Sequence, residues 1–83
     1  MEFLFKETAE RDLQFFAKNQ KIIKRIEALL KDIQQHPLFG IGKPEALKEN
    51  LSGFWSRRIN REHRIIYTYE EDAVTFYSFR GHC

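Results

Sequence analysis

The chain has 83 residues, which is room for one domain, and 42% of them are hydrophobic, including eight Phe, three Tyr and one Trp. That content is enough for a core and excludes an intrinsically disordered chain. The 14 Lys and Arg nearly balance the 12 Asp and Glu, so the net charge of +2 does not by itself indicate a nucleic-acid binder. The single cysteine, Cys83, excludes a small disulfide-stapled scaffold and favours a reducing compartment.

The N-terminal residues do not resemble a secretory signal. Residues 1–6 lack both a basic start and the following apolar run. No segment approaches the ~20 consecutive apolar residues that a membrane-spanning helix needs. We therefore expect a cytoplasmic protein that does not enter a membrane.

The first half of the chain is predicted to contain one strand and two helices. Phe3 and Phe5 alternate with their neighbours, which is typical of a short strand. From Glu7 onward the apolar residues return at helical spacing as far as Ala17. A second, stronger helical stripe follows, comprising Ile22, Ile26, Leu29 and Ile33. Asn19 can cap the second helix and Pro37 ends it, so the two helices form an antiparallel hairpin.

The second half changes from helical to strand periodicity. Residues 38–43 hold two of the four glycines and indicate a loop. Pro44 suits the first turn of a short helix that extends through Leu51. Beyond Gly53, residues 54–60, 64–69 and 74–80 are rich in Ile, Val, Thr and aromatics and predict an antiparallel meander. The predicted fold is a single α+β domain, residues 1–83, in two layers.

Arginines are concentrated in the first predicted hairpin. Four of the seven lie between Arg57 and Arg64, with Glu62 as the single acid among them. Strand alternation places Arg58 opposite in direction to Arg57, and Arg64 can lie beside Arg58 across the turn. Two guanidinium groups on one sheet face suit a phosphate ligand. The alternative is a solvated hairpin whose arginines pair with nearby glutamates.

Three further residues are candidates for proton transfer or ligand contact. Glu45 at the start of the predicted short helix is either an acid that interacts with the helix dipole or a general base facing the arginines. Lys48, one helical step away, could touch the same ligand. A terminal strand that alternates regularly would place Arg80 and His82 on a common face, which makes His82 the best general-acid candidate, although a terminal histidine is usually exposed and idle.

Metal and cofactor sites are not expected. The three histidines, at 36, 63 and 82, show no metal-binding spacing, and a lone cysteine provides no CxxC pair. The glycine motifs that bind nucleotides are also missing.

Several motifs together resemble the YoeB (Txe) toxins of bacterial type II toxin–antitoxin modules. The resemblance runs nearly end to end, and its most specific part is the run Leu-Ser-Gly-Phe-Trp-Ser-Arg-Arg-Ile at residues 51–59. The other matching segments are Gly42-Lys43-Pro44-Glu45, Leu47-Lys48, Glu62-His63-Arg64 and Arg80-Gly81-His82.

The resemblance implies a RelE-like, microbial-RNase-like fold and a metal-independent endoribonuclease that cleaves mRNA in the A site of the 70S ribosome. By the family pattern, Glu45 is similar to the general base, Arg64 to the phosphate-stabilising arginine and His82 to the general acid. Lys48 and Arg58 match substrate-contacting positions. The implied protein partners are a YefM-like antitoxin and a second copy of the chain.

The end of the chain departs from the family pattern. The family usually closes with His-Tyr, whereas this chain closes with His82-Cys83. Because the terminal tyrosine belongs to the family's substrate-contacting set, Cys83 occupies that position here. Two alternatives stay open. One is a binding toxin of the same fold, in the manner of the ParE gyrase poisons, which share the scaffold but lack the base and the acid. The other, suggested by Cys83, is a catalytically weak protein that binds RNA or the ribosome.

Overall fold

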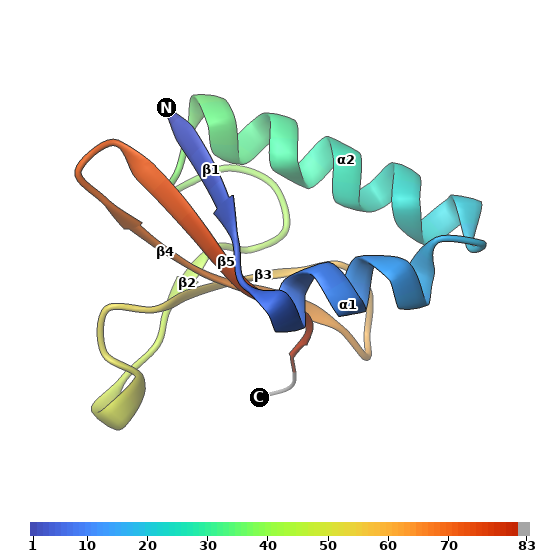
Figure 1. Ribbon diagram of the computed structural model, residues 1–83. Helices are drawn as coiled ribbons and strands as arrows, with labels where there is room; N and C mark the ends of the chain where they lie inside the picture. Colours follow the sequence, from blue (N-terminus) through green and yellow to red (C-terminus); the bar gives the residue numbers. More distant parts are fainter. Residues whose placement is uncertain (82–83) are drawn as a thin grey trace.

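The computed structural model describes residues 1–81, which form two helices, a short 3-10 helix and five strands (Figure 1). In chain order these are β1 (Glu2–Phe5), α1 (Glu7–Phe16), α2 (Gln20–Gln35), β2 (Glu45–Ala46), the 3-10 helix η1 (Glu49–Leu51), β3 (Trp55–Arg58), β4 (Arg64–Glu70) and β5 (Ala73–Gly81). The expected strand, helical hairpin and three-stranded meander are confirmed.

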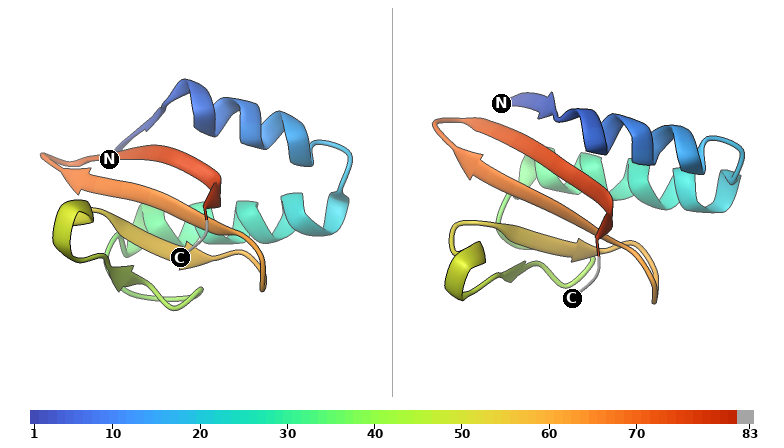
Figure 2. Two further views of the ribbon diagram at one scale, coloured as in Figure 1. Left: turned by 90° about the horizontal axis from the view of Figure 1, so that it is seen from below. Right: turned by 60° about the horizontal axis from the view of Figure 1, so that its bottom comes forward.

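All five strands belong to one sheet, in the order β1-β5-β4-β3-β2. β1 runs parallel to β5, while the other neighbouring pairs are antiparallel. The helical hairpin is therefore part of the long connection from the β1 edge to the opposite edge of the sheet. It covers one face and leaves the other uncovered by helices (Figure 2).

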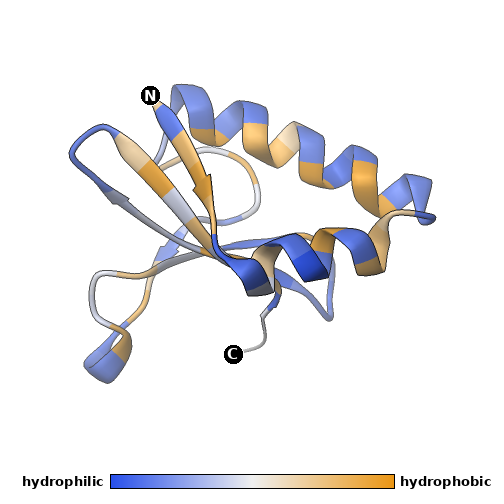
Figure 3. Cartoon of the chain, in the orientation of Figure 1, coloured by the Kyte–Doolittle hydropathy of each residue, from blue (hydrophilic) through white to orange (hydrophobic). Residues whose placement is uncertain are grey.

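The core lies between the helices and the sheet. The helices contribute their apolar stripes, which appear as orange bands on the ribbon in Figure 3. The buried hydrophobic residues are Ala9, Phe16, Ile26, Leu29, Ile33, Ile59, Ile65, Tyr67, Val74, Phe76 and Phe79. Trp55 of β3 packs against this cluster. The sheet face that meets the helices is thus filled by core packing, so a functional site is expected on the opposite face.

The boundaries of α2 follow from local chemistry. The side chain of Asn19 accepts a hydrogen bond from the amide of Ile22 at 3.1 Å, which caps the first turn. The helix ends at Gln35, because His36 precedes Pro37 and takes a non-helical conformation (φ −138°, ψ 81°). Both ends were predicted from the sequence and are confirmed.

The predicted short helix over residues 44–51 is wrong. Glu45 and Ala46 instead form the edge strand β2, which pairs with Ser56 and Trp55 of β3. The amide of Leu47 continues this pairing by donating to the carbonyl of Phe54 at 2.9 Å. Only η1 is helical in this segment. Pairing with an existing strand satisfies the backbone better than an isolated helix of two turns, which is marginal in water.

Strand β5 does not alternate regularly along its length. Phe76 and Phe79 are both fully buried although they are three residues apart, and the register against β4 shifts at this point. One carboxylate oxygen of Asp12 accepts from the amides of Phe79 (2.9 Å) and Arg80 (3.1 Å), which holds the irregular strand against α1. The regular alternation on which the expected common face of Arg80 and His82 depended is therefore absent from the described part of β5.

Candidate active site

The open face of the sheet carries the charged residues that the sequence singled out. Arg58 pairs directly with Arg64 between β3 and β4, and Glu45 of β2 pairs with Ser56 of β3. Cross-strand partners share a face, and so do residues two apart on one strand. Glu45, Arg58 and Arg64 therefore project from the same face, opposite the helices, and the predicted neighbourhood of Arg58 and Arg64 is confirmed.

Glu45 and Arg64 are in direct contact. Nη1 of Arg64 lies 3.5 Å from Oε1 of Glu45. The Arg64 side chain is 21% exposed and the Glu45 side chain 63%, so the pair is accessible to a ligand from the solvent side. A solvent-exposed pair of this kind adds little to folding stability. Because β2 is a strand, Glu45 does not sit at a helix start, and its interpretation as a partner of a helix dipole is wrong.

Lys48 follows β2 in the chain and is not placed as predicted. It is exposed and immediately precedes η1, so no helix joins it to Glu45. The expectation that the two are one helical step apart is wrong. Its role as a ligand contact stays a prediction, which now rests on its match to a substrate-contacting position of the family pattern.

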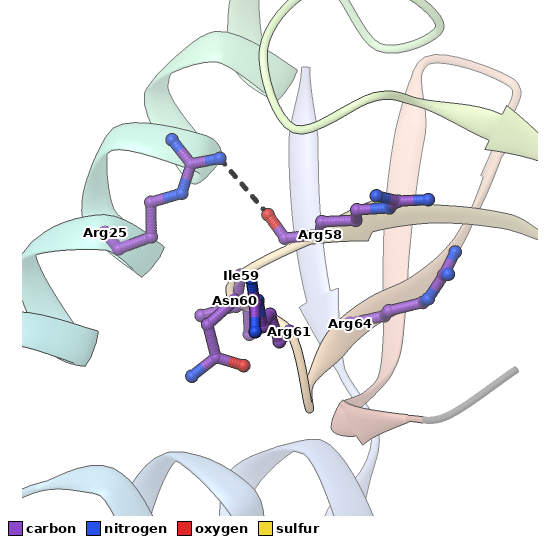
Figure 4. A pocket seen from close by; sticks show the side chains of 6 residues that line it. All are labelled: Arg25, Arg58, Ile59, Asn60, Arg61 and Arg64. Atoms are coloured by element: carbon purple, nitrogen blue, oxygen red, sulfur yellow. Dashed lines mark hydrogen bonds between the residues drawn. The ribbon is translucent and has the colours of Figure 1, made fainter.

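A pocket of about 370 Å³ lies next to these arginines, at the β3–β4 turn (Figure 4). Its lining residues are Arg25, Arg58, Ile59, Asn60, Arg61 and Arg64. In the close-up, the Arg58 and Arg64 side chains run side by side in one direction, and Arg25 reaches from α2 toward the main chain of Arg58. Nη2 of Arg25 donates to that carbonyl at 3.3 Å. Sequence reasoning missed Arg25, because no local pattern connects it with a residue 33 positions away.

Arg57, the neighbour of Arg58, is fully buried on the helix side of β3. Its Nε donates to the Tyr67 hydroxyl (3.1 Å) and its Nη1 to Asp32 (2.5 Å). The remaining acceptors are the main-chain carbonyls of His36, Phe39 and Ile41. These five contacts match the five N–H donors of a guanidinium. The alternative of a solvated arginine hairpin is therefore wrong for Arg57, which instead holds the loop leading to β2.

Asp32 and Tyr67 complete this buried network. Burial alone would raise the pKa of Asp32, but hydrogen bonds from Arg57 and from the Ile41 amide, together with the positive charge, hold that pKa below its usual value of 3.8. Burial raises the pKa of Tyr67, and its hydroxyl donates to the Pro37 carbonyl at 2.7 Å. Gly40 has φ +124°, and a Cβ there would lie 1.9 Å from the Asp32 carboxylate. The loop thus needs glycine at this position.

The predicted acid and the terminal residue, His82 and Cys83, lie outside the described residues. Gly81 pairs with Arg64 across β4 and β5, so the described chain ends beside the Glu45–Arg64 pair. Arg80 takes a different direction, because its guanidinium lies 3.7 Å from the centre of the Phe15 ring of α1. Arg80 is therefore engaged on the helix side.

The described part of the chain offers neither a cluster of metal ligands nor a helix that could span a membrane. Residues 1–81 hold no group of three or more His, Cys, Asp or Glu side chains arranged to bind a metal ion. Within the same range, neither helix has the length and apolar character required to cross a bilayer.

Known proteins with this fold are similar over the whole chain. Residues 5–83 match the family described as the YoeB-like toxin of bacterial type II toxin–antitoxin systems. A Toxin YoeB of Synechocystis is 48% identical over 83 residues, covering 99% of this chain and 96% of the relative. The solved YoeB dimer from Staphylococcus aureus is 41% identical, with a TM-score of 0.91 over 100% of this chain and 98% of that one. A YoeB–YefM heterotetramer from the same organism matches with a TM-score of 0.89, 41% identity and coverage of 100% and 98%.

The sheet with helices on one face and an arginine-rich open face defines a toxin of the RelE-like fold. Sequence identity of 41–48% with YoeB toxins along the whole chain narrows the class from RelE-like toxins to one family. The chain belongs to the YoeB-like toxins of bacterial type II toxin–antitoxin systems.

Proposed function

We propose that this toxin is a ribosome-dependent endoribonuclease that cleaves mRNA in the ribosomal A site and thereby inhibits translation. The observation that carries the proposal is the contact between the Glu45 carboxylate and the Arg64 guanidinium, 3.5 Å apart on an open face with Arg58 directly beside Arg64. A carboxylate next to paired phosphate-binding groups is what an RNase needs at the bond it breaks. Family membership supports the same activity.

Glu45 is the proposed general base. It takes the proton of the 2′-hydroxyl, whose oxygen then attacks the adjacent phosphorus. The exposed position of the Glu45 side chain allows a ribose to approach it, and the contact with Arg64 limits its rotation. The nucleophile belongs to the substrate, so the proposed reaction requires neither a covalent residue nor a metal ion.

Arg64 is the proposed stabiliser of the phosphorane charge, with Arg58 and Lys48 as substrate contacts. The guanidinium of Arg64 contacts the carboxylate of Glu45. It can contact the substrate phosphate as well, because it presents several N–H donors in a fixed plane. Donors already in place when charge develops need no rearrangement, which makes electrostatic stabilisation effective. Arg58 lies directly across from Arg64 and adds a second positive group on the same face.

His82 is the proposed general acid, giving a proton to the leaving 5′-oxygen, and Cys83 takes the position of the family's terminal tyrosine. In the sequence both directly follow Gly81, the strand partner of Arg64. The products of this chemistry are a 2′,3′-cyclic phosphate, or its hydrolysed form, and a 5′-hydroxyl. Each proton-transfer group contributes about 10² to 10⁴ in rate.

Primer extension on mRNA from cells that express the toxin tests the proposal. We expect cuts inside translated codons, together with arrest of protein synthesis. Intact transcripts with DNA damage would instead identify a gyrase poison of the same fold. Ribosome occupancy without any cut would identify a binding protein that lacks catalysis.

We propose that the toxin is held inactive by a YefM-like antitoxin in the cytoplasm and forms a dimer with a second copy. The Staphylococcus aureus relatives were solved as a YoeB dimer and as YoeB–YefM complexes. An acidic segment of the antitoxin that covers Arg58 and Arg64 would compete with RNA for the same groups. Co-expression with the antitoxin should restore growth and give a complex that purifies together, whereas normal yield of the toxin alone without toxicity would contradict the proposal.

A further inference from the structure

The pocket at the β3–β4 turn extends beyond the residues that the proposed reaction uses. Arg58 and Arg64 belong to the proposed active site, but Arg25 and Arg61 do not, and all four line the same pocket. Arg25 is contributed by α2 and Arg61 by the turn, so the pocket joins the open face of the sheet to the helical layer (Figure 4).

The pocket is positively charged and has no acidic lining. Its remaining lining residues are Ile59 and Asn60, and no carboxylate is among them. Within residues 1–81, the side chains of Arg58 and Arg61 have no hydrogen-bond or ion-pair partner. Arg25 uses one Nη2 donor for the Arg58 carbonyl, so most of its donors remain available. Uncompensated guanidinium groups around a hollow attract an anion with several oxygens.

The turn itself is built to hold this shape. The side-chain oxygen of Asn60 accepts from the amides of Glu62 (2.9 Å) and His63 (2.8 Å). The oxygen of Asn60 is therefore occupied in fixing the turn, while its NH₂ group remains as a neutral donor at the pocket.

From these contacts we infer that the pocket is a second phosphate subsite, in which Arg25 and Arg61 bind an RNA phosphodiester next to the one at Arg64. The inference rests on the proposed function. An RNA strand whose scissile phosphate lies at Glu45 and Arg64 has another phosphate one nucleotide away on each side. Arg58 and Arg64 border both the proposed active site and the pocket. One of the two neighbouring phosphates therefore enters the pocket at Arg25 and Arg61.

The lining favours RNA over an acidic peptide. Peptide grooves bind through buried aromatic and aliphatic anchors, whereas this pocket has Ile59 as its single apolar lining residue. Guanidinium forks match phosphate oxygens, and backbone phosphate contacts carry no base preference. The subsite should thus increase affinity for any RNA sequence and leave codon preference to other contacts.

The test compares the double variant Arg25→Ala/Arg61→Ala with Arg11→Ala as the matched control. Arg11 is an exposed arginine on α1 that pairs with Glu7, away from the pocket. The probes are an RNA dinucleotide, which has a single phosphodiester, and an RNA octanucleotide. Each has a 2′-deoxy sugar on the 5′ side of one phosphodiester, so that binding is measured without cleavage there. Affinity is followed by fluorescence anisotropy over a range of salt concentrations, with the full-length chain.

We expect the double variant to bind the longer RNA about ten-fold more weakly, with a salt slope reduced by about 0.7 for each phosphate that the protein no longer neutralises. Binding of the dinucleotide should change little, because its single phosphate occupies the site at Arg64 and leaves none for the pocket, and Arg11→Ala should behave as wild type. An equal decrease in affinity for both RNA lengths, an equal decrease in Arg11→Ala, or an unchanged salt slope would overturn the inference.

Two further binding measurements test other ligands for the pocket, namely ribosomal RNA and an acidic antitoxin peptide. Weaker binding of mRNA-free 70S ribosomes by the double variant, with normal binding of oligonucleotides, would also overturn the inference, because the phosphate would then belong to ribosomal RNA and not to the strand held at Arg64. Weaker binding of an acidic antitoxin peptide with unchanged binding of every RNA would overturn the subsite. The outcome is separable from the proposed function: a toxin that binds RNA through Arg25 and Arg61 but leaves mRNA intact keeps the subsite and refutes the nuclease.

Discussion

Arg57 and Arg58 are consecutive residues of β3, yet they have opposite roles. Arg57 is fully buried, and five acceptors from α2, the following loop and β4 occupy its donors. Arg58 is exposed, faces the other side of the sheet and lies across from Arg64. One arginine run thus contains a buried structural member and an exposed member that is free for the proposed contact with substrate, and the direction of each side chain distinguishes the two.

The buried side also supports the open side. The segment 36–43, which leads into β2, exposes its large apolar side chains Leu38, Phe39 and Ile41 and so has little packing of its own. It is held by its carbonyls, three of which accept from Arg57, and by the amide of Ile41, which donates to Asp32 at 3.0 Å. Because Glu45 follows this segment closely, the buried network helps to fix the proposed base.

The largest expected effect is the difference in the free energy of unfolding between a variant that lacks Arg57 and one that lacks Arg58. Arg57→Met leaves Asp32 and three loop carbonyls without their donor, and we expect a loss of about 3–5 kcal/mol in the free energy of unfolding. Arg58→Met should change the free energy of unfolding by no more than about 0.5 kcal/mol, because its side chain is exposed. Urea unfolding of both variants gives the comparison, and similar losses in the two would contradict the assigned roles.

Replacing the proposed general base, Glu45, should have the opposite effect to replacing Arg57: catalytic activity should be lost while the free energy of unfolding is kept. Glu45→Ala is expected to lower the cleavage rate on programmed ribosomes by about 10²- to 10⁴-fold, and His82→Gln by a similar factor. The exposed ion pair with Arg64 adds little stability, so the unfolding midpoint of Glu45→Ala should stay near wild type. Glu10→Ala, which removes an exposed acid from α1, is the control and should cleave normally.

The features of the fold and of the candidate site that could be predicted from the sequence are those determined by neighbouring residues in the chain. Helical periodicity and the Asn19 cap located α2, and strand alternation put Arg58 and Arg57 on opposite faces. The role of Arg57 could not be foreseen, because three of its acceptors are main-chain carbonyls, which every residue has. β2 was missed for a related reason: two residues are too few to show a period, and their pairing depends on β3.

Acid should weaken the buried network through Asp32. Its pKa is lower in the folded chain than the usual 3.8, so the unfolded chain binds the proton more readily. The stability that ionised Asp32 provides is complete above about pH 5 and is lost as the pH falls through its lowered folded pKa. Asp32→Asn should therefore be less stable than wild type at pH 7, and the difference should shrink on acidification. A difference independent of pH would show that the charge of Asp32 does not matter.

The smallest effect is expected at the end of the chain, where Cys83 replaces the family's tyrosine. A thiol is a weaker hydrogen-bond donor than a phenol, and the side chain of cysteine is much shorter than that of tyrosine, so we expect Cys83 to contribute little contact with a phosphate or a nucleobase. Cys83→Tyr should raise the cleavage rate about ten-fold, the equivalent of one good transition-state hydrogen bond of about 1.4 kcal/mol. Cys83→Ser should leave the rate almost unchanged, because it exchanges one short polar side chain for another. A large drop in rate in Cys83→Ser, or activity that falls with mild oxidant and returns with reductant, would instead assign the thiol a role of its own, either as a reactive thiolate or as an oxidation switch.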